Sequence, residues 1–209
     1  MFQVRYRKYG RYLPGTVISS RESFDWLYDE DIKLAAEAGL KAFRFSIAWP
    51  RVQPTGAGVA DRAWLDLYER IIDTMLARDV EPWPTLFHWD IPATLSMDWR
   101  DRDLAYRFAD YARIVAERLG DRVRNWILLN EPNTVAVMGY GMGLHAPGVS
   151  SAQAILAASH HQNLADCRIH PLCARACRQT RPNCSCRGHP DSRSAPRLLL
   201  HRKRNRPGN

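Results

Sequence analysis

The stretch from about residue 25 to residue 145 alternates between two patterns of apolar and polar residues. Three segments repeat their apolar residues at helical spacing and predict helices over 27–38, 62–78 and 102–119. Three shorter runs of apolar, aromatic and β-branched residues predict strands over 42–49, 82–87 and 125–130. Helices and strands alternate, and the strand runs are apolar on both faces, as in buried parallel strands of βα units. The pattern therefore predicts an α/β fold, either a (β/α)8 barrel or a doubly wound sheet.

Polar and aromatic residues gather at the carboxyl ends of the predicted strands, where a barrel enzyme builds its chemistry. These residues are Arg44, His88, Trp89, Asp90, Asn130 and Glu131. A carboxyl group in a partly apolar site has a raised pKa, so Glu131 could stay protonated as a general acid must. The amide of Asn130 can both donate to and accept from a hydroxyl group. The alternative for Glu131 is a structural ion pair with a neighbouring helix.

The other candidates at the strand ends have a functional and a structural interpretation. The imidazole of His88 and the indole N–H of Trp89 suit sugar hydroxyls, and an aromatic face suits the apolar side of a pyranose. A buried histidine bonded to backbone beside a packed tryptophan is the structural alternative. Arg44 lies within an apolar strand, where a guanidinium needs an anionic partner. We expect it to face a barrel interior and orient a catalytic carboxylate, or else to form a salt bridge at the strand end.

Charge and cysteine content divide the 209-residue chain into two unlike parts. Residues 1–165 hold 19 Lys/Arg and 20 Asp/Glu, whereas residues 166–209 hold 11 Lys/Arg, two acidic residues and all five cysteines. The excess positive charge behind the net charge of +8 therefore lies in the last segment and not in the body of the chain. No apolar run reaches the roughly 18 residues of a membrane helix, and residues 1–20 lack the apolar region of a secretory signal. These features predict a cytoplasmic location.

Four motifs in the body resemble glycoside hydrolase family 1, the retaining β-glucosidases and β-galactosidases. The motifs are FRFSIAWPR at 43–51, TLFHWDIP at 85–92, GDRVRNWILLNEP at 120–132 and GYGMGLHAPG at 139–148. The resemblance covers residues 25–165 and implies the first half of a (β/α)8 TIM barrel. It also implies hydrolysis of terminal β-linked sugars, such as a β-glucoside, without a metal or an organic cofactor.

The resemblance assigns a role to each candidate residue. It makes Glu131 the catalytic acid/base and places Asn130 on the 2-hydroxyl of the sugar. It places His88 and Trp89 in the pocket of the non-reducing sugar, and Arg44 against the catalytic nucleophile. Two related interpretations stay open: a 6-phospho-β-glycosidase, and a sugar-binding remnant without catalysis.

Two departures from the family pattern predict that the chain alone is catalytically incomplete. The segment 1–24 lacks the family's Phe-x-Trp-Gly and Gln-Ile-Glu-Gly motifs, and no (I/V)-T-E-N-G motif with the nucleophile occurs in the 209 residues. Retaining hydrolysis needs two carboxylates roughly 5–5.5 Å apart, and only Glu131 is present. Three strands would also leave an unpaired parallel sheet edge and the apolar barrel interior exposed, which favours aggregation.

The segment 166–209 departs from the family in composition, since it is rich in Arg, Pro, Cys and Ser and contains no aromatic residue of the Phe, Trp or Tyr type. We expect little stable structure from residue 163 onward, and a disordered tail from residue 166 that is translated out of frame. The rival is a basic module that binds nucleic acid or a metal. Its cysteines lack the paired spacing of common zinc sites, and no aromatic residues interleave with its arginines.

Overall fold

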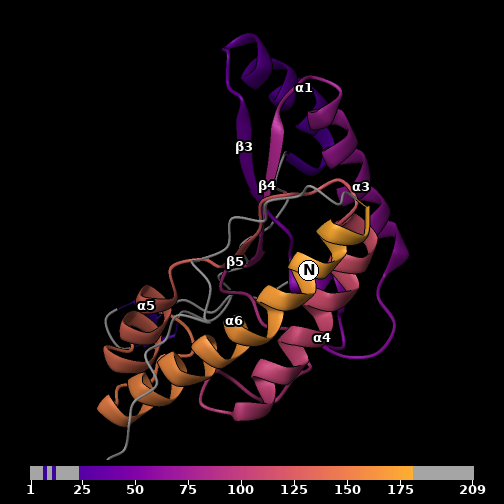
Figure 1. Ribbon diagram of the computed structural model, residues 1–209. Helices are drawn as coiled ribbons and strands as arrows, with labels where there is room; N and C mark the ends of the chain where they lie inside the picture. The colour runs from indigo at the N-terminus through magenta and orange to yellow at the C-terminus, as the bar shows by residue number, and fades with distance from the viewer. Residues whose placement is uncertain (1–6, 9–10, 13–23, 181–209) are drawn as a thin grey trace, which may run out of the picture.

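A three-stranded parallel sheet forms the centre of the computed structural model, which describes residues 7–8, 11–12 and 24–180 (Figure 1). Its strands are β3 (Ala42–Ser46), β4 (Glu81–Phe87) and β5 (Ile127–Leu129), in the order β3-β4-β5. Ser46 pairs with Thr85, which in turn pairs with Ile127. A short antiparallel pair, β1 (Arg7–Lys8) and β2 (Arg11–Tyr12), stands apart from this sheet.

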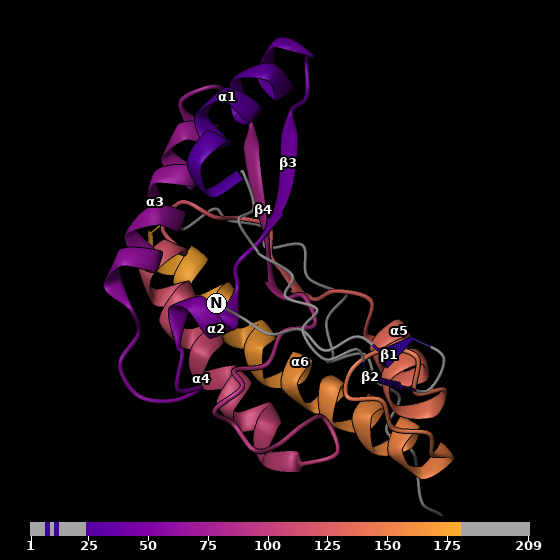
Figure 2. The ribbon, with the colours of Figure 1, turned by 180° about the vertical axis from the view of Figure 1, so that it is seen from behind.

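Helices connect the strands and pack beside the sheet. They are α1 (Phe24–Glu37), α2 (Trp49–Val52), α3 (Arg62–Leu76), α4 (Arg102–Leu119), α5 (Pro132–Thr134), the π-helix η1 (Val135–Gly141) and α6 (Ala152–Thr180). Views from both sides place α1 and α3 on one side of β3 and β4, and they place α4 beside α6 (Figures 1 and 2). The strands β3 and β4, and β4 and β5, are thus joined by two complete βαβ crossovers. Their helices, α3 and α4, lie in one layer beside the sheet.

The structure confirms all three predicted helices and all three predicted strands, with shifts at their ends. The predicted strand 42–49 ends at Ser46, because α2 begins at Trp49 with Pro50 in its first turn. A proline is tolerated there because the first N–H groups of a helix have no partner within it. The predicted strand 125–130 shortens to Ile127–Leu129.

Helix α6 corrects the expectation of little structure from residue 163 onward. It runs without a break to Thr180 and buries Ala158, Ala165 and Ile169. Small apolar residues at this spacing lie on one face of a helix, where they allow close packing against α4. The tail predicted to be disordered from residue 166 is therefore helical as far as residue 180. Residues 181–209 lie outside the described residues, as does most of the predicted segment 1–24.

The core lies between the sheet and its helices and contains a chain of aromatic rings. The ring of Phe108, in α4, is 5.4 Å from Trp49, 5.6 Å from Phe87 and 5.9 Å from Trp99, between centroids. All of these rings are at most 1% exposed. Edge-to-face and offset contacts of this kind add to the stabilisation from burial, and they fix α4 against the strand ends that carry the candidate site.

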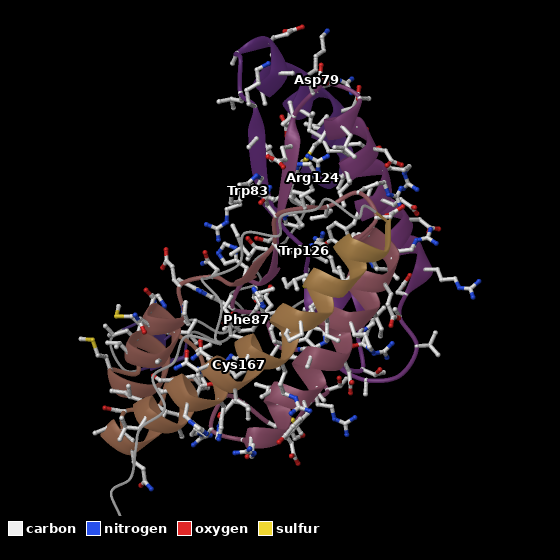
Figure 3. The ribbon with its side chains drawn as sticks, in the orientation of Figure 1. Asp79, Trp83, Phe87, Arg124, Trp126 and Cys167 are labelled. Carbon is white, nitrogen blue, oxygen red and sulfur yellow. The ribbon has the colours of Figure 1, made fainter. Side chains whose placement is uncertain are left out.

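The face of β3 opposite the helices is open among the described residues, so the prediction of strands buried on both faces is wrong for β3. It is confirmed for the second half of β4, where Pro84, Thr85, Leu86 and Phe87 are all buried. Along β3 the side chains of Ala42, Arg44 and Ser46 are exposed, while Phe45 on the helix side is buried. Trp83 of β4 pairs with Arg44 and is 37% exposed. Figure 3 labels its side chain. Part of the barrel interior is therefore exposed, as predicted, but the polar side chains of Arg44 and Ser46 lie on it, so the expectation of an apolar interior is wrong at these positions.

Candidate functional site

The carboxyl ends of β3, β4 and β5 meet at one rim of the sheet, because the three strands are parallel. This rim brings together four of the five residues that the sequence analysis proposed for the site: Arg44, His88, Trp89 and Asn130. The fifth, Glu131, follows Asn130 directly and is exposed. Residues up to 86 positions apart in the chain thereby become hydrogen-bonded neighbours. In barrels this rim is the catalytic face.

Arg44 extends across the sheet and contacts both neighbouring strands. Its Nε donates to Thr85 Oγ1 at 3.0 Å, and its terminal Nη2 donates to the side-chain oxygen of Asn130. Arg44 is exposed, so the expectation of a buried guanidinium that needs an anionic partner is wrong here. Both described acceptors are neutral oxygens. The two bonds nevertheless hold a positive charge at the open face, beside Asn130.

Asn130 is the most constrained residue of the rim and is only 6% exposed. Its N–H donates to the carbonyl of Phe87 at 2.8 Å, which continues the pairing of β5 with β4. Its backbone carbonyl accepts from the indole N–H of Trp89 at 3.0 Å. Because the amide oxygen faces Arg44, the side-chain NH₂ of Asn130 points the other way. A ligand on that side therefore meets a hydrogen-bond donor.

Two non-glycine residues of the rim adopt the left-handed backbone conformation. Trp89 has φ 79°, and Glu131 has φ 45° and ψ 58°. Such residues cost of order 1–3 kcal/mol each and persist only where their surroundings hold them. At Glu131 the chain turns from β5 directly into α5, whose first residue is Pro132. The strained backbone thus falls on the residue proposed as the acid/base.

His88 and Trp89 follow β4 and present their rings at the rim. The Nδ1 atom of His88 is 2.8 Å from Ser46 Oγ, which fixes the imidazole against the end of β3. The ring of Trp89 is 5.8 Å from that of His88 and 5.2 Å from that of His145, between centroids. Neither His88 nor Trp89 is buried, so the structural alternative of a core histidine beside a packed tryptophan does not apply.

Sequence reasoning assigned no role to Ser46, Thr85 or His145 at the rim. Ser46 and Thr85 lie within the motifs that carry the family resemblance. Their positions near Arg44 and His88 in a parallel sheet could have indicated that they lie at the rim. His145 belongs to the motif at 139–148, but only the folded loop brings it to Trp89.

Gly139 explains how that loop reaches the rim. A Cβ atom at this position would lie 2.6 Å from the carbonyl oxygen of Ala146. Glycine alone allows the backbone of residue 146 to pass this close to η1. The loop is then fixed by two further bonds, in which His145 N–H donates to the carbonyl of Met138 and Val149 N–H to that of Gly139.

The described part of the chain holds no cluster of three or more His, Cys, Asp or Glu side chains that could bind a metal ion. Its helices also include none with the length and apolar character needed to cross a membrane.

Comparison with known proteins identifies the architecture to which this rim belongs. The family model for glycosyl hydrolase family 1 matches residues 21–195. This chain belongs to that family. The match extends past the boundary that the sequence analysis predicted at residue 165. The family 1 β-glucosidase from Thermotoga maritima superimposes with a TM-score of 0.74 at 38% identity, over 79% of this chain and 40% of that one.

Curated family 1 relatives are similar over the same region. Beta-glucosidase A from Thermotoga maritima is 43% identical over 155 residues, which cover 73% of this chain and 34% of the relative. Beta-glucosidase 6 from Oryza sativa is 48% identical over 124 residues, which cover 58% of this chain and 24% of the relative. The three parallel strands and their helices are thus part of a TIM barrel, and the chain spans about a third of the length of these relatives or less.

Proposed function

We propose that this chain carries the acid/base half of a retaining β-glycosidase site of the β-glucosidase type. Membership of family 1 supports the reaction class. The observation that carries the proposal is the turn at the end of β5, where Asn130 is buried and hydrogen-bonded at three atoms while Glu131 is exposed. A rigid support beneath an accessible carboxyl group is what general acid catalysis needs, because the proton must be aimed at one oxygen atom.

In the proposed reaction Glu131 acts twice. It first donates its proton to the glycosidic oxygen while a second carboxylate attacks the anomeric carbon and forms a glycosyl-enzyme. Glu131 then removes a proton from the water that hydrolyses this intermediate and so regains its acid form. The second carboxylate must lie roughly 5–5.5 Å from Glu131. Since the 209 residues contain no (I/V)-T-E-N-G motif, another polypeptide segment has to supply it.

The remaining rim residues fit the binding of the sugar and of that second carboxylate. The NH₂ group of Asn130 offers a donor to a sugar hydroxyl, and Ser46 holds the imidazole of His88 in one orientation. Trp89 is 38% exposed as a residue, and its ring offers an aromatic surface to a pyranose. The charge of Arg44 lies on the open face, where it would stabilise an ionised nucleophile. The solved relative from Thermotoga maritima is known in complexes with glucoimidazole and with deoxynojirimycin, which supports a sugar-shaped ligand.

A complementation assay tests this proposal. The 209-residue chain alone should release no nitrophenol from an aryl β-glucoside. Mixing it with the segment of Thermotoga maritima β-glucosidase A that lies beyond the matched region should restore turnover. Glu131→Gln should then lower kcat about 10²–10⁴-fold. The control Glu117→Gln, on the outer face of α4 and paired with Arg113, should leave kcat unchanged.

Leaving-group chemistry separates an acid/base role from other roles of Glu131. In the complemented enzyme, Glu131→Ala should retain cleavage of a dinitrophenyl glucoside, whose leaving group needs no proton. Azide should accelerate its turnover and yield the β-configured glucosyl azide, because azide needs no general base. Turnover by the 209-residue chain alone, or complemented turnover that is insensitive to Glu131→Gln, would contradict the proposal.

A further inference from the structure

The indole N–H of Trp89 is already used at the rim. It donates to the backbone carbonyl of Asn130 at 3.0 Å and is therefore not directed at a sugar. This differs from the sequence interpretation, in which that N–H group served sugar hydroxyls. The bond joins the end of β4 to the peptide group that immediately precedes Glu131, so its effect falls on the backbone of the proposed acid/base.

Both peptide groups that flank the Cα atom of Glu131 are held by hydrogen bonds. The preceding carbonyl, that of Asn130, accepts from Trp89, and the following carbonyl, that of Glu131 itself, accepts from Val135 N–H at 3.1 Å. The orientation of the preceding peptide plane sets φ, and that of the following plane sets ψ. The backbone angles φ 45° and ψ 58° are unfavourable for a glutamate. The two hydrogen bonds must therefore stabilise this strained conformation.

Trp89 is itself supported by the loop that follows η1. The ring of His145 packs against the indole at 5.2 Å and 42°, and the loop that carries His145 is bonded to η1. Trp89 also has φ 79°, a backbone conformation that its neighbours must stabilise. The contacts therefore form a series from His145 to Trp89 to the carbonyl of Asn130.

We propose that Trp89 is a positioning residue, which holds Glu131 in its left-handed conformation through the indole N–H bond to Asn130, and that His145 positions Trp89. This inference rests on the proposed function, because it gives a purpose to the orientation of the Glu131 carboxyl group. Under this proposal the loop 142–149 contributes to catalysis indirectly, because His145 positions Trp89 and does not itself contact the reacting atoms.

The test uses NMR spectroscopy of the full 209-residue chain, labelled with ¹³C and ¹⁵N. Trp83 is the matched control, because the residue is 37% exposed against 38% for Trp89, and its indole N–H has no acceptor among the described residues. The indole proton of Trp89 should exchange with solvent about tenfold more slowly than that of Trp83, as expected for a net hydrogen bond.

Replacing Trp89 with β-(3-benzothienyl)alanine keeps the size and shape of the ring but puts sulfur in place of the N–H group. We expect the ¹³Cα and ¹³Cβ shifts of Glu131 to move toward values averaged over ordinary backbone conformations, while the thermal midpoint of the chain stays within a few degrees. His145→Ala should move the same signals in the same direction, and His145→Phe, which keeps a ring, should restore them. Trp83→Phe should leave them unchanged.

Two results would overturn the inference. One is an indole proton of Trp89 that exchanges as fast as that of Trp83. The other is a set of Glu131 shifts that the benzothienyl replacement leaves unchanged. Because both measurements concern the free chain, they are independent of turnover. Failure of the natural 209-residue chain to gain turnover in the complementation assay, with both NMR results as expected, would instead count against the proposed function.

Discussion

Tyr111→Phe removes one hydroxyl group from the centre of the core and leaves the ring volume unchanged. Tyr111, in α4, is fully buried, and its hydroxyl lies 3.1 Å from the carbonyl oxygen of Ile47 and 3.3 Å from that of Leu86. These carbonyls belong to the chain segments that lead into the rim from β3 and β4. One proton is shared between two acceptors, so the substitution deprives both carbonyls of a donor in a site without water access.

The magnitude follows from this geometry. Removal of a donor that leaves a buried acceptor without a partner costs about 1–3 kcal/mol in total, and here two carbonyls lose the same donor. We therefore expect Tyr111→Phe to lower the free energy of unfolding by roughly 1.5–3 kcal/mol. For a chain of this size the thermal midpoint should fall by roughly 3–10 °C. Urea unfolding followed by far-ultraviolet circular dichroism measures the first quantity, and calorimetry measures the second.

Tyr106→Phe is the matched control in the same helix. The hydroxyl of Tyr106 only accepts a bond from the exposed Arg102, and its ring lies 4.3 Å below the guanidinium of Arg168, a contact that phenylalanine keeps. We expect a change within about 0.5 kcal/mol. A loss for Tyr111→Phe no larger than that for Tyr106→Phe would refute the reasoning, because the buried hydroxyl would then contribute nothing.

Alkaline pH gives an independent check on the same hydroxyl. Burial raises the pKa of Tyr111 well above its ordinary value of 10, and the nearby Tyr68 raises it further. A raised pKa in the folded state means that the stabilisation is fully present below pH 10 and is lost as the pH rises beyond that value. The difference in unfolding free energy between the natural chain and Tyr111→Phe should therefore shrink above pH 10.

Two further predictions concern other parts of the fold. Hydrogen bonding by Arg122, with help from Arg118, lowers the pKa of Glu69 below 4.5. The contribution of the Glu69 carboxylate to the free energy of unfolding is therefore present above pH 4.5, and it is lost as the pH falls through the folded-state pKa. Glu69→Gln should destabilise the chain by less than about 1 kcal/mol at pH 7, because the pair is partly exposed, and the difference should vanish in acid unfolding curves. Gly139→Ala should cost roughly 1–3 kcal/mol in thermal unfolding, because its Cβ would meet a backbone oxygen. Gly141→Ala should cost less, since its Cβ would meet only the movable end of a side chain.

The helices and strands of this chain could be read from local pattern to within a few residues. The segment 102–119 shows the reason: its apolar residues recur at helical spacing and Gly120 follows, so α4 ends where predicted. Local pattern does not predict helix α6 beyond residue 163: Ala158, Ala165 and Ile169 lie at helical spacing, but the basic and cysteine-rich composition beyond residue 166 is typical of an unstructured segment.

The sequence by itself also determined which residues lie at the rim, since residues that follow parallel strands must share one edge of the sheet. What only the tertiary structure decided is how they contact one another. The bond from Arg44 to Asn130 spans 86 positions, and the contacts of Trp89 with Asn130 and His145 span 41 and 56. Local preference even points the wrong way at Glu131, whose left-handed backbone is unfavourable for a glutamate. One of the two bonds on the peptide groups that flank Glu131 comes from Val135, four residues away, but the other comes from Trp89, 41 positions away. No pattern confined to a few consecutive residues contains that second bond.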